Sequence, residues 1–339
     1  MSHTVVRGKP NAAQLYLDRV LDAILSIFDL VRVTLEFVLL NPNLIYQFQT
    51  NGATGEVITN EQLLKHAVSL ARALTDKGAK GKYVMLLMRN HQDTVAIYYA
   101  VMFAGVIPFM MDPNTTVYEL THFLKLVEPS FVFCDREFQE PLQESLKGCK
   151  ELKPSVLVAD EPGVLKQFAQ RHSDDIKSFQ VAAALMDDPV MLLPTSGSTG
   201  IPKAAIVTHR GLVAQLPSPW SYHTQFPTPT SKVMILTTIQ WMTFTMMTTS
   251  STAYHIPILI SPKKTTAEHV AEMLEKYRVR NTNICKYFCS LKQCIELVSH
   301  GAVRKIAHRD ALARTDAPVS VNAKVRCEFS FTWHFGMKK

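Results

Sequence analysis

Residues 193–209 read LPTSGSTGIPKAAIVTH. Small and hydroxyl residues fill the middle of this stretch, and a proline and a lysine follow them directly. Two interpretations fit: a flexible linker, or a loop that wraps backbone N–H groups and hydroxyls around a phosphate. The apolar runs at 188–196 and 204–209 have the length of buried strands, and flexible linkers rarely connect two such strands. The pattern therefore favours a phosphate-binding loop.

The residue types in this loop supply what a phosphate needs. Glycines allow a tight backbone curl, hydroxyls add hydrogen-bond donors, and a lysine adds positive charge. The Gly-Lys-Ser/Thr ending of the nucleoside-triphosphatase P-loop is absent, because Ile, Pro and Lys follow the second glycine. The kinase pattern Gly-x-Gly-x-x-Gly is absent as well. The predicted phosphate-binding residues are Thr195, Ser196, Gly197, Ser198, Thr199, Gly200 and Lys203.

Upstream of the loop, apolar runs of strand length alternate with helical patterns. Thr59 and Gln62 have the spacing of a capping box and predict the start of a helix. A second helix is expected to start near Asn90 or Asp93 and to end at Gly105, and a third covers 118–126. The predicted strands cover residues 83–88, 106–112, 131–135 and 154–160. This alternation predicts an α/β fold with mixed, mostly parallel sheets flanked by helices.

Downstream of the loop, residues 216–231 contain four prolines and predict an irregular segment. A strand is expected over 232–238, and Thr265 with Glu268 predicts a second capping box before a helix at 267–277. The thirty residues 233–262 carry no Asp, Glu, Lys or Arg. Their many threonines favour buried strands and a packed helix over a transmembrane span. Residues 20–40 are apolar but contain four charged residues, which is typical of an amphipathic helix.

Composition excludes several functional classes. The chain has 339 residues, of which 47% are hydrophobic, enough for a large core. The net charge of +7 comes mostly from residues 301–339, with eight Lys/Arg and three Asp/Glu, so no nucleic-acid partner is expected. The six cysteines form no CxxC pair, and the grouped Cys285, Cys289 and Cys294 are interpreted as reduced thiols. No metal ligands are predicted.

The central stretch resembles the signature of the adenylate-forming (AMP-binding) enzyme family. That family includes acyl-CoA synthetases, 4-coumarate–CoA ligases, non-ribosomal adenylation domains and firefly-type luciferases. Its pattern is Thr-Ser-Gly-Ser-Thr-Gly-x-Pro-Lys-Gly, usually followed by Thr-His. The chain matches this pattern from Thr195 to Lys203 and again at Thr208 and His209, and it departs at Ala204. Residues 58–135 also resemble the family's N-terminal region, and the 4-coumarate-ligase and luciferase-like branch is the most similar.

The resemblance implies a two-step ligase. A carboxylate, from a fatty or an aromatic acid, attacks the α-phosphate of magnesium-bound ATP, which gives an acyl-adenylate and pyrophosphate. A thiol such as CoA then displaces AMP. The 195–203 loop would hold the β- and γ-phosphates, and it would act through position and charge without a covalent role. Trp241 and Met242 occupy the place of an aromatic/His pair that borders the acyl pocket in the family. Ordinary core packing is the alternative for both side chains.

The chain also departs from the family pattern. It contains no Tyr-Gly-x-Thr-Glu segment, no matching ribose-binding Gly-Asp, and no catalytic lysine of a C-terminal small domain, so no catalytic residue is predicted. The resemblance implies an N-terminal helical segment at 1–40, an incomplete AMP-binding large-domain portion at 41–290, and a divergent basic tail at 291–339. The small C-terminal domain is expected to be missing.

Three hypotheses remain open from the sequence. The first is an active ligase of acyl-CoA-synthetase type. The second is an inactive, truncated family member that retains phosphate or acyl binding and associates with an intact relative. The third is a replaced C-terminal end, as mis-splicing would produce. Family members occur in the cytoplasm and in peroxisomes, and the chain ends in Met-Lys-Lys rather than the peroxisomal signal Ser-Lys-Leu. The compartment therefore stays open between these two.

Overall fold

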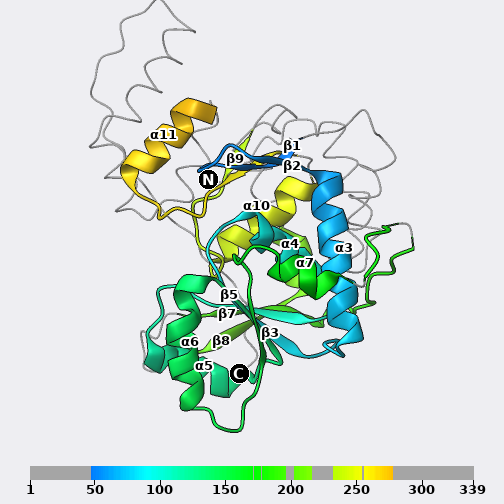
Figure 1. Ribbon diagram of the computed structural model, residues 1–339. Helices are drawn as coiled ribbons and strands as arrows, with labels where there is room; N and C mark the ends of the chain where they lie inside the picture. Colours follow the sequence, from blue (N-terminus) through cyan, green and yellow to red (C-terminus); the bar gives the residue numbers. More distant parts are fainter. Residues whose placement is uncertain are drawn as a thin grey trace, which may run out of the picture.

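The structure is a computed structural model that describes residues 47–170, 172–176, 178–195, 202–215, 232–253 and 256–277. In these residues the chain forms two sheets, with helices between them and on the outer faces (Figure 1). This is the mixed α/β architecture that the alternating sequence pattern predicts. The segments predicted at 20–40, 216–231 and 291–339, and the cysteines at 285, 289 and 294, lie outside the described residues.

The large sheet has the strand order β6–β5–β3–β4–β7–β8. All neighbouring strands in it are parallel except β7 and β8, which pair antiparallel. Every predicted strand from residue 83 to residue 209 is present. The strands are β3 (Tyr83–Leu87), β4 (Ile107–Met110), β5 (Phe131–Cys134), β6 (Ser155–Val158), β7 (Pro189–Pro194) and β8 (Ala204–Thr208).

The small sheet has the order β2–β1–β10–β9. β1 (Gln47–Asn51) pairs antiparallel with β2 (Val57–Thr59) and parallel with β10 (Ile258–Ile260), which pairs parallel with β9 (Val233–Met234). The prediction of a strand over 232–238 is therefore too long, because β9 is shorter. The chain leaves the sheet early because it turns before Trp241, whose backbone N–H donates to the carbonyl of Thr238 at 3.1 Å.

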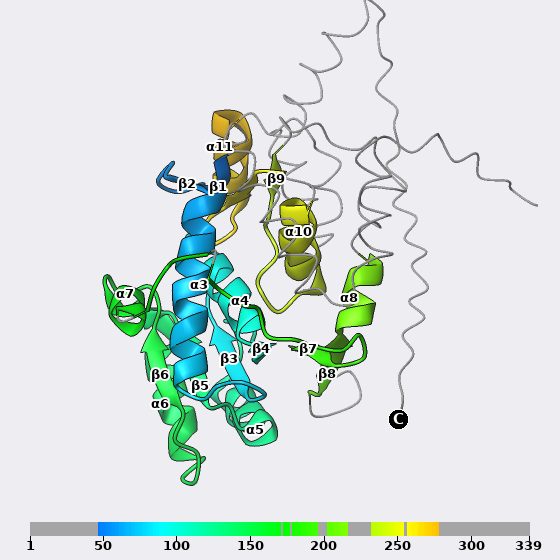
Figure 2. The ribbon, with the colours of Figure 1, turned by 90° about the vertical axis from the view of Figure 1, so that its right-hand side faces the viewer.

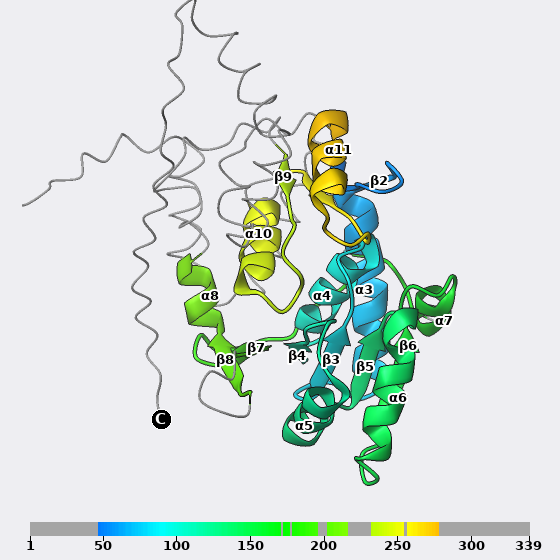
Figure 3. The same ribbon diagram turned by 90° about the vertical axis from the view of Figure 1, so that its left-hand side faces the viewer.

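Helices cover both faces of the large sheet. α4 (Gln92–Phe103) and α10 (Met242–Ala253) lie between the two sheets, and α3 (Asn60–Asp76) runs beside α4 (Figure 1). α5 (Val117–Val127) and α6 (Gln139–Lys147) lie on the opposite face, as Figures 2 and 3 show. The remaining elements are the 3-10 helix η2 (Arg136–Phe138), α7 (Val164–Ala169), α8 (His209–Gln215) and α11 (Ala267–Tyr277).

The helix ends show how local sequence sets these bounds. The predicted capping box at Thr59 is present: its hydroxyl accepts from the N–H of Gln62 at 3.2 Å, and the Gln62 side chain accepts from the N–H of Thr59 at 2.8 Å. α4 begins after His91, between the two predicted starts, and ends as predicted at Gly105, where φ is +65°. α11 corrects a prediction: its cap is Thr266, one residue after Thr265, and the Thr266 hydroxyl accepts from the N–H of His269 at 3.2 Å.

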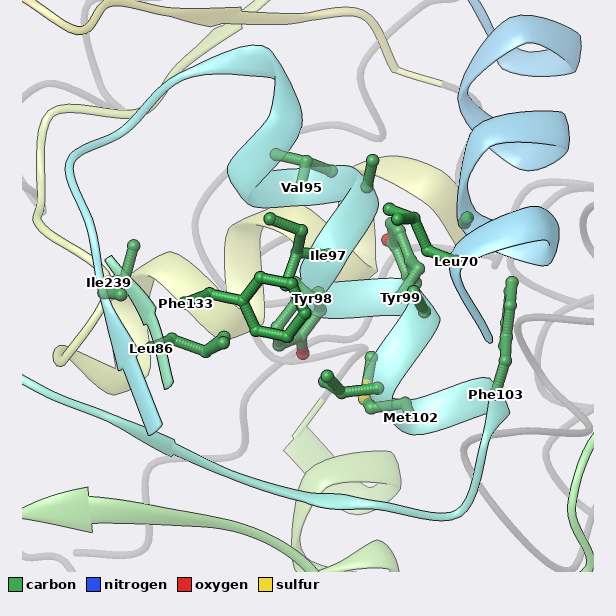
Figure 4. Packing of buried hydrophobic residues seen from close by; sticks show 14 of the residues in the cluster. Leu70, Leu86, Val95, Ile97, Tyr98, Tyr99, Met102, Phe103, Phe133 and Ile239 are labelled. Carbon is green, nitrogen blue, oxygen red and sulfur yellow. The ribbon is translucent and has the colours of Figure 1, made fainter. Parts of the chain in front are cut away.

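One apolar core joins the two sheets. Every residue of α4 from Thr94 to Phe103 is buried, as expected for a helix covered on all sides. Figure 4 shows Tyr98 of α4 beside Leu86 and Phe133 of the large sheet. The same cluster includes the small-sheet residue Ile258. A second cluster fills the space between the large sheet and α5 and α6. The candidate phosphate loop connects β7 and β8, which lie at one edge of the large sheet.

Candidate functional site

The candidate phosphate loop is the connection of an antiparallel hairpin. Pro194 at the end of β7 pairs with Ala204 at the start of β8. One step further, the backbone N–H and the hydroxyl of Thr195 both donate to the carbonyl of Lys203, at 2.8 and 3.0 Å. The base of the loop is therefore closed by two hydrogen bonds to one oxygen. Two predicted residues, Thr195 and Lys203, are thus brought together.

The other predicted phosphate ligands, Ser196, Gly197, Ser198, Thr199 and Gly200, lie outside the described residues, so their role stays a prediction. Lys203 is exposed, and no ion pair joins its ammonium to any residue that the structure describes. An exposed cation at the closed base of a loop rich in hydroxyls can attract and hold an anion.

The alanine at position 204 fits the local backbone. Ala204 lies in β8, is partly buried, and packs against the apolar cluster under α5. Glu128 is the non-glycine residue with positive φ in the described part of the chain, so Ala204 occupies no conformation that favours glycine. An alanine at position 204, where the family pattern has glycine, is therefore compatible with the strand conformation.

The Thr-His ending has a structural role. The Thr208 hydroxyl accepts from the N–H of Gly211 at 3.2 Å, which satisfies a free donor in the first turn of α8. His209 is buried, and its N–H donates to the carbonyl of Asp188 at 3.2 Å. The bond from His209 ties the exit from β8 to Asp188, the residue before β7, and so holds the two strands of the hairpin together at the end opposite the loop.

A contact from α5 reaches the loop from outside the hairpin. The Nε2 of His122 lies 3.0 Å from the carbonyl oxygen of Pro202, the residue before Lys203. His122 is not among the residues predicted from the sequence, because 80 positions separate it from Pro202 and no spacing pattern connects them.

Known proteins resemble this chain in sequence and in fold. A family model described as an AMP-binding enzyme matches residues 41–290. The chain belongs to the AMP-binding enzyme family. It is 27% identical over 170 residues to "4-coumarate--CoA ligase-like 9" of Arabidopsis thaliana, a match that covers 49% of this chain and 29% of the relative. It is 29% identical over 176 residues to luciferin 4-monooxygenase of Photuris pensylvanica, covering 49% of this chain and 32% of that protein. The matched part thus spans about a third of these relatives.

Solved structures share the fold. The luciferase-like enzyme of the nonluminescent mealworm Zophobas morio superposes with a TM-score of 0.64 at 20% identity, covering 75% of this chain and 58% of that chain. The ATP-bound MatB of Rhodopseudomonas palustris gives a TM-score of 0.58 at 20% identity, covering 69% of this chain and 48% of that chain.

The described residues contain no helix with the length and apolar character needed to cross a membrane.

The two residues predicted to border an acyl pocket lie in different surroundings. Trp241 is 60% exposed and precedes α10. Met242 is the first residue of α10 and packs, partly buried, against the core between the sheets. Met242 therefore packs in the core, the alternative given above for both residues, whereas Trp241 does not. Their role in binding an acyl group stays a prediction.

A second polar group lies at the carboxyl ends of β3 and β5. Asp135 is buried, and its carboxylate accepts from the N–H of Arg89 at 2.6 Å and lies 2.9 Å from Nε2 of His91. The Arg89 guanidinium pairs with Glu137, and this hydrogen bond raises the pKa of Arg89. Every charged group here has a partner, so the arrangement stabilises the two strand ends. In the described part of the chain, no group of three or more His, Cys, Asp or Glu residues is placed to hold a metal ion.

Proposed function

We propose that this chain binds the triphosphate of magnesium-bound ATP at the loop between β7 and β8 and takes part in the adenylation of a carboxylic acid. The observation that carries the proposal is the closed base of this loop, where Thr195 donates two hydrogen bonds to Lys203. The loop carries the stretch that resembles the family signature, it lies within the residues that the family model matches, and ATP is bound in a solved structure of the same fold.

The donor set fits a polyphosphate. The hydroxyls predicted in the loop and the exposed ammonium of Lys203 supply donors and charge, the combination that binds phosphate oxygens. When bound, magnesium-bound ATP supplies the α-phosphorus that a carboxylate attacks. The part played by this chain is to orient the phosphate tail and to neutralise its charge in a fixed geometry. Lys203 is the described residue whose ammonium would hold it, and Thr195, whose N–H and hydroxyl both donate to the Lys203 carbonyl, would keep the base of the loop closed.

The acid and the acceptor are proposed from the relatives. The name "4-coumarate--CoA ligase-like 9" favours an aromatic acid, with CoA as the acceptor thiol, and a fatty acid is the other candidate. Trp241 is proposed to contact the acid because its indole is exposed next to the start of α10. Phosphate binding without turnover, alone or beside an intact relative, is the alternative function.

A binding experiment tests the phosphate site. Calorimetry of the full chain with magnesium-bound ATP is expected to show binding that weakens about tenfold to a hundredfold in Lys203→Ala, the range that one charge-assisted hydrogen bond supplies. Lys264→Ala is the matched control, because it removes the same charge from an exposed lysine after the small sheet and should bind like the wild type.

An exchange experiment then separates the two functions. Incorporation of labelled pyrophosphate into ATP, measured with a panel of aromatic and fatty acids, is expected for adenylation. Binding without exchange for any acid would support phosphate binding alone. Absence of ATP binding by the wild-type chain would contradict the proposed function.

A further inference from the structure

The contact between α5 and Pro202 concerns the lysine that follows. Pro202 has no N–H, so its carbonyl is the only backbone group through which it can hydrogen-bond. That carbonyl accepts from His122, and the next carbonyl along the chain, that of Lys203, accepts from Thr195. The peptide planes on both sides of the Lys203 Cα are therefore held. Two held planes leave the direction of the Cα–Cβ bond of Lys203 little freedom.

His122 is well placed to hold the first of these planes. α5 begins with a capping box between Thr116 and Glu119, and its apolar face is buried against the large sheet. The His122 ring packs against Phe123 with centroids 5.3 Å apart, and Phe123 packs against Phe109 of β4 at 5.0 Å. The imidazole therefore belongs to the rigid body of the sheet and not to the loop.

The acceptor determines the tautomer. A carbonyl oxygen only accepts, so Nε2 of His122 must carry the proton, in either the neutral or the charged ring. Ala204, on the other side of Lys203, packs against the same cluster as α5. The start of β8 is therefore anchored to the α5 face both by an apolar contact and by a hydrogen bond.

We propose that His122 is a positioning residue that aims the ammonium of Lys203 at the phosphate tail of a bound nucleotide. It does so by holding the Pro202 carbonyl from a helix outside the loop. This inference rests on the proposed function for the identity of the ligand, but the positioning of the loop base is independent of any ligand. The two parts can therefore be tested separately.

Two substitutions separate the hydrogen bond from the bulk of the side chain. His122→Leu keeps much of the bulk of the side chain on α5 and removes the donor, whereas His122→Gln retains an N–H of similar reach. The matched control is His172→Leu, because His172 is half-buried after α7, and its ring lies 3.5 Å from Asp76, on another element. Urea denaturation identifies any variant whose overall stability has changed.

Hydrogen exchange of the free protein tests the positioning. The Thr195 amide donates to Lys203, so its exchange rate reports on the loop base. Mass spectrometry of peptides that contain Thr195 is expected to show exchange at least tenfold faster in His122→Leu, with His122→Gln within about threefold of the wild type and His172→Leu unchanged. Equal exchange in His122→Leu and in the wild type would overturn the inference.

A double-substitution cycle tests the action through Lys203. His122→Leu is expected to weaken binding of magnesium-bound ATP about tenfold, His122→Gln less than threefold, and His172→Leu not at all. In the Lys203→Ala background, His122→Leu should have no further effect, because the ammonium that it aims is gone. Independent, multiplying effects of the two substitutions would show that His122 does not act through Lys203. If the wild type does not bind ATP, the proposed function fails, and the exchange rates still decide the positioning.

Discussion

Burial determines the acidity, and hence the reactivity, of the Cys134 thiol. Cys134 is fully buried at the end of β5, where burial, with a smaller contribution from the carboxylates of Asp135 and Asp160, raises the pKa of its thiol to about 12. Because the thiolate is the nucleophile, we expect iodoacetamide at pH 8 to leave Cys134 unmodified in the native chain. Peptide mass spectrometry should then detect modification in urea. Equal modification rates with and without urea would contradict the burial of this residue.

The candidate site shows what the sequence reveals about single residues and what it does not. Thr195 and Lys203 were predicted because both lie within one short pattern, and the structure joins them through two hydrogen bonds. His122 was not predictable, since it reaches Pro202 only after the sheet has formed. Trp241 is exposed despite its apolar type, because it lies in a turn and not inside α10. Residue type alone does not distinguish these positions.

The end of α4 was predicted correctly because a glycine, Gly105, ends the helix. At Gly105, and also at Gly78 after α3, the chain leaves the helix with φ of +65° and +67°, and both ends form the hydrogen-bond pair of a Schellman motif. The cap of α11 was misplaced by one residue, because the capping-box pattern selects Thr265 with Glu268, whereas in the structure the hydroxyl of the adjacent Thr266 accepts from the N–H of His269. Strand β9 was predicted too long, because its apolar composition continues into a turn.

The two helix-ending glycines offer a matched pair of substitutions. A Cβ at Gly78 would meet no atom within 4 Å, so Gly78→Ala carries only the cost of a left-handed backbone, about 1–2 kcal/mol of unfolding free energy. A Cβ at Gly105 would lie 2.7 Å from the Cβ of Ala182. We expect Gly105→Ala to lower the free energy of unfolding in urea by more than Gly78→Ala does.

The difference between the two variants isolates the steric contact. Ala182→Gly removes the methyl group that the new Cβ at position 105 would meet. In the double variant Gly105→Ala/Ala182→Gly, the destabilisation should approach the Gly78→Ala value, once the effect of Ala182→Gly alone is subtracted. If Gly105→Ala and Gly78→Ala prove equally costly, the close approach of residues 182 and 105 is not a constraint on the fold.

At the scale of the whole molecule, the arrangement of the two sheets depends on contacts that no local pattern contains. The sequence predicted an α/β class with mostly parallel strands, and the structure confirms it. The sequence did not predict that β1 and β10, 207 positions apart between Asn51 and Ile258, lie side by side. α4 is buried on every side because it lies in the core that the two sheets share. The apolar run from Val95 to Phe103 indicates that burial, but it does not show which elements cover the helix.

One polar side chain also links the two sheets. Asn90 follows β3 of the large sheet, is 6% exposed, and donates from Nδ2 to the carbonyl of Thr237, beyond β9 of the small sheet, at 2.7 Å. Asn90→Leu leaves this carbonyl without its donor, and we expect the free energy of unfolding to fall by about 1–3 kcal/mol. Urea denaturation measures this loss, which should be the same at pH 4.5 and at pH 8.

Asn90→Asp should add a pH dependence of defined sign to the same loss. A carboxyl group at this buried position faces a carbonyl oxygen, so only its protonated form can donate, and its folded pKa rises above the unfolded value of about 3.9. A raised pKa contributes stability that is present below the unfolded pKa and is lost as pH rises through the folded pKa. We therefore expect Asn90→Asp to be less destabilised than Asn90→Leu at pH 4.5 and more destabilised at pH 8. A constant difference between the two variants across this range would mean that residue 90 is hydrated, and that the bond to Thr237 does not couple the sheets.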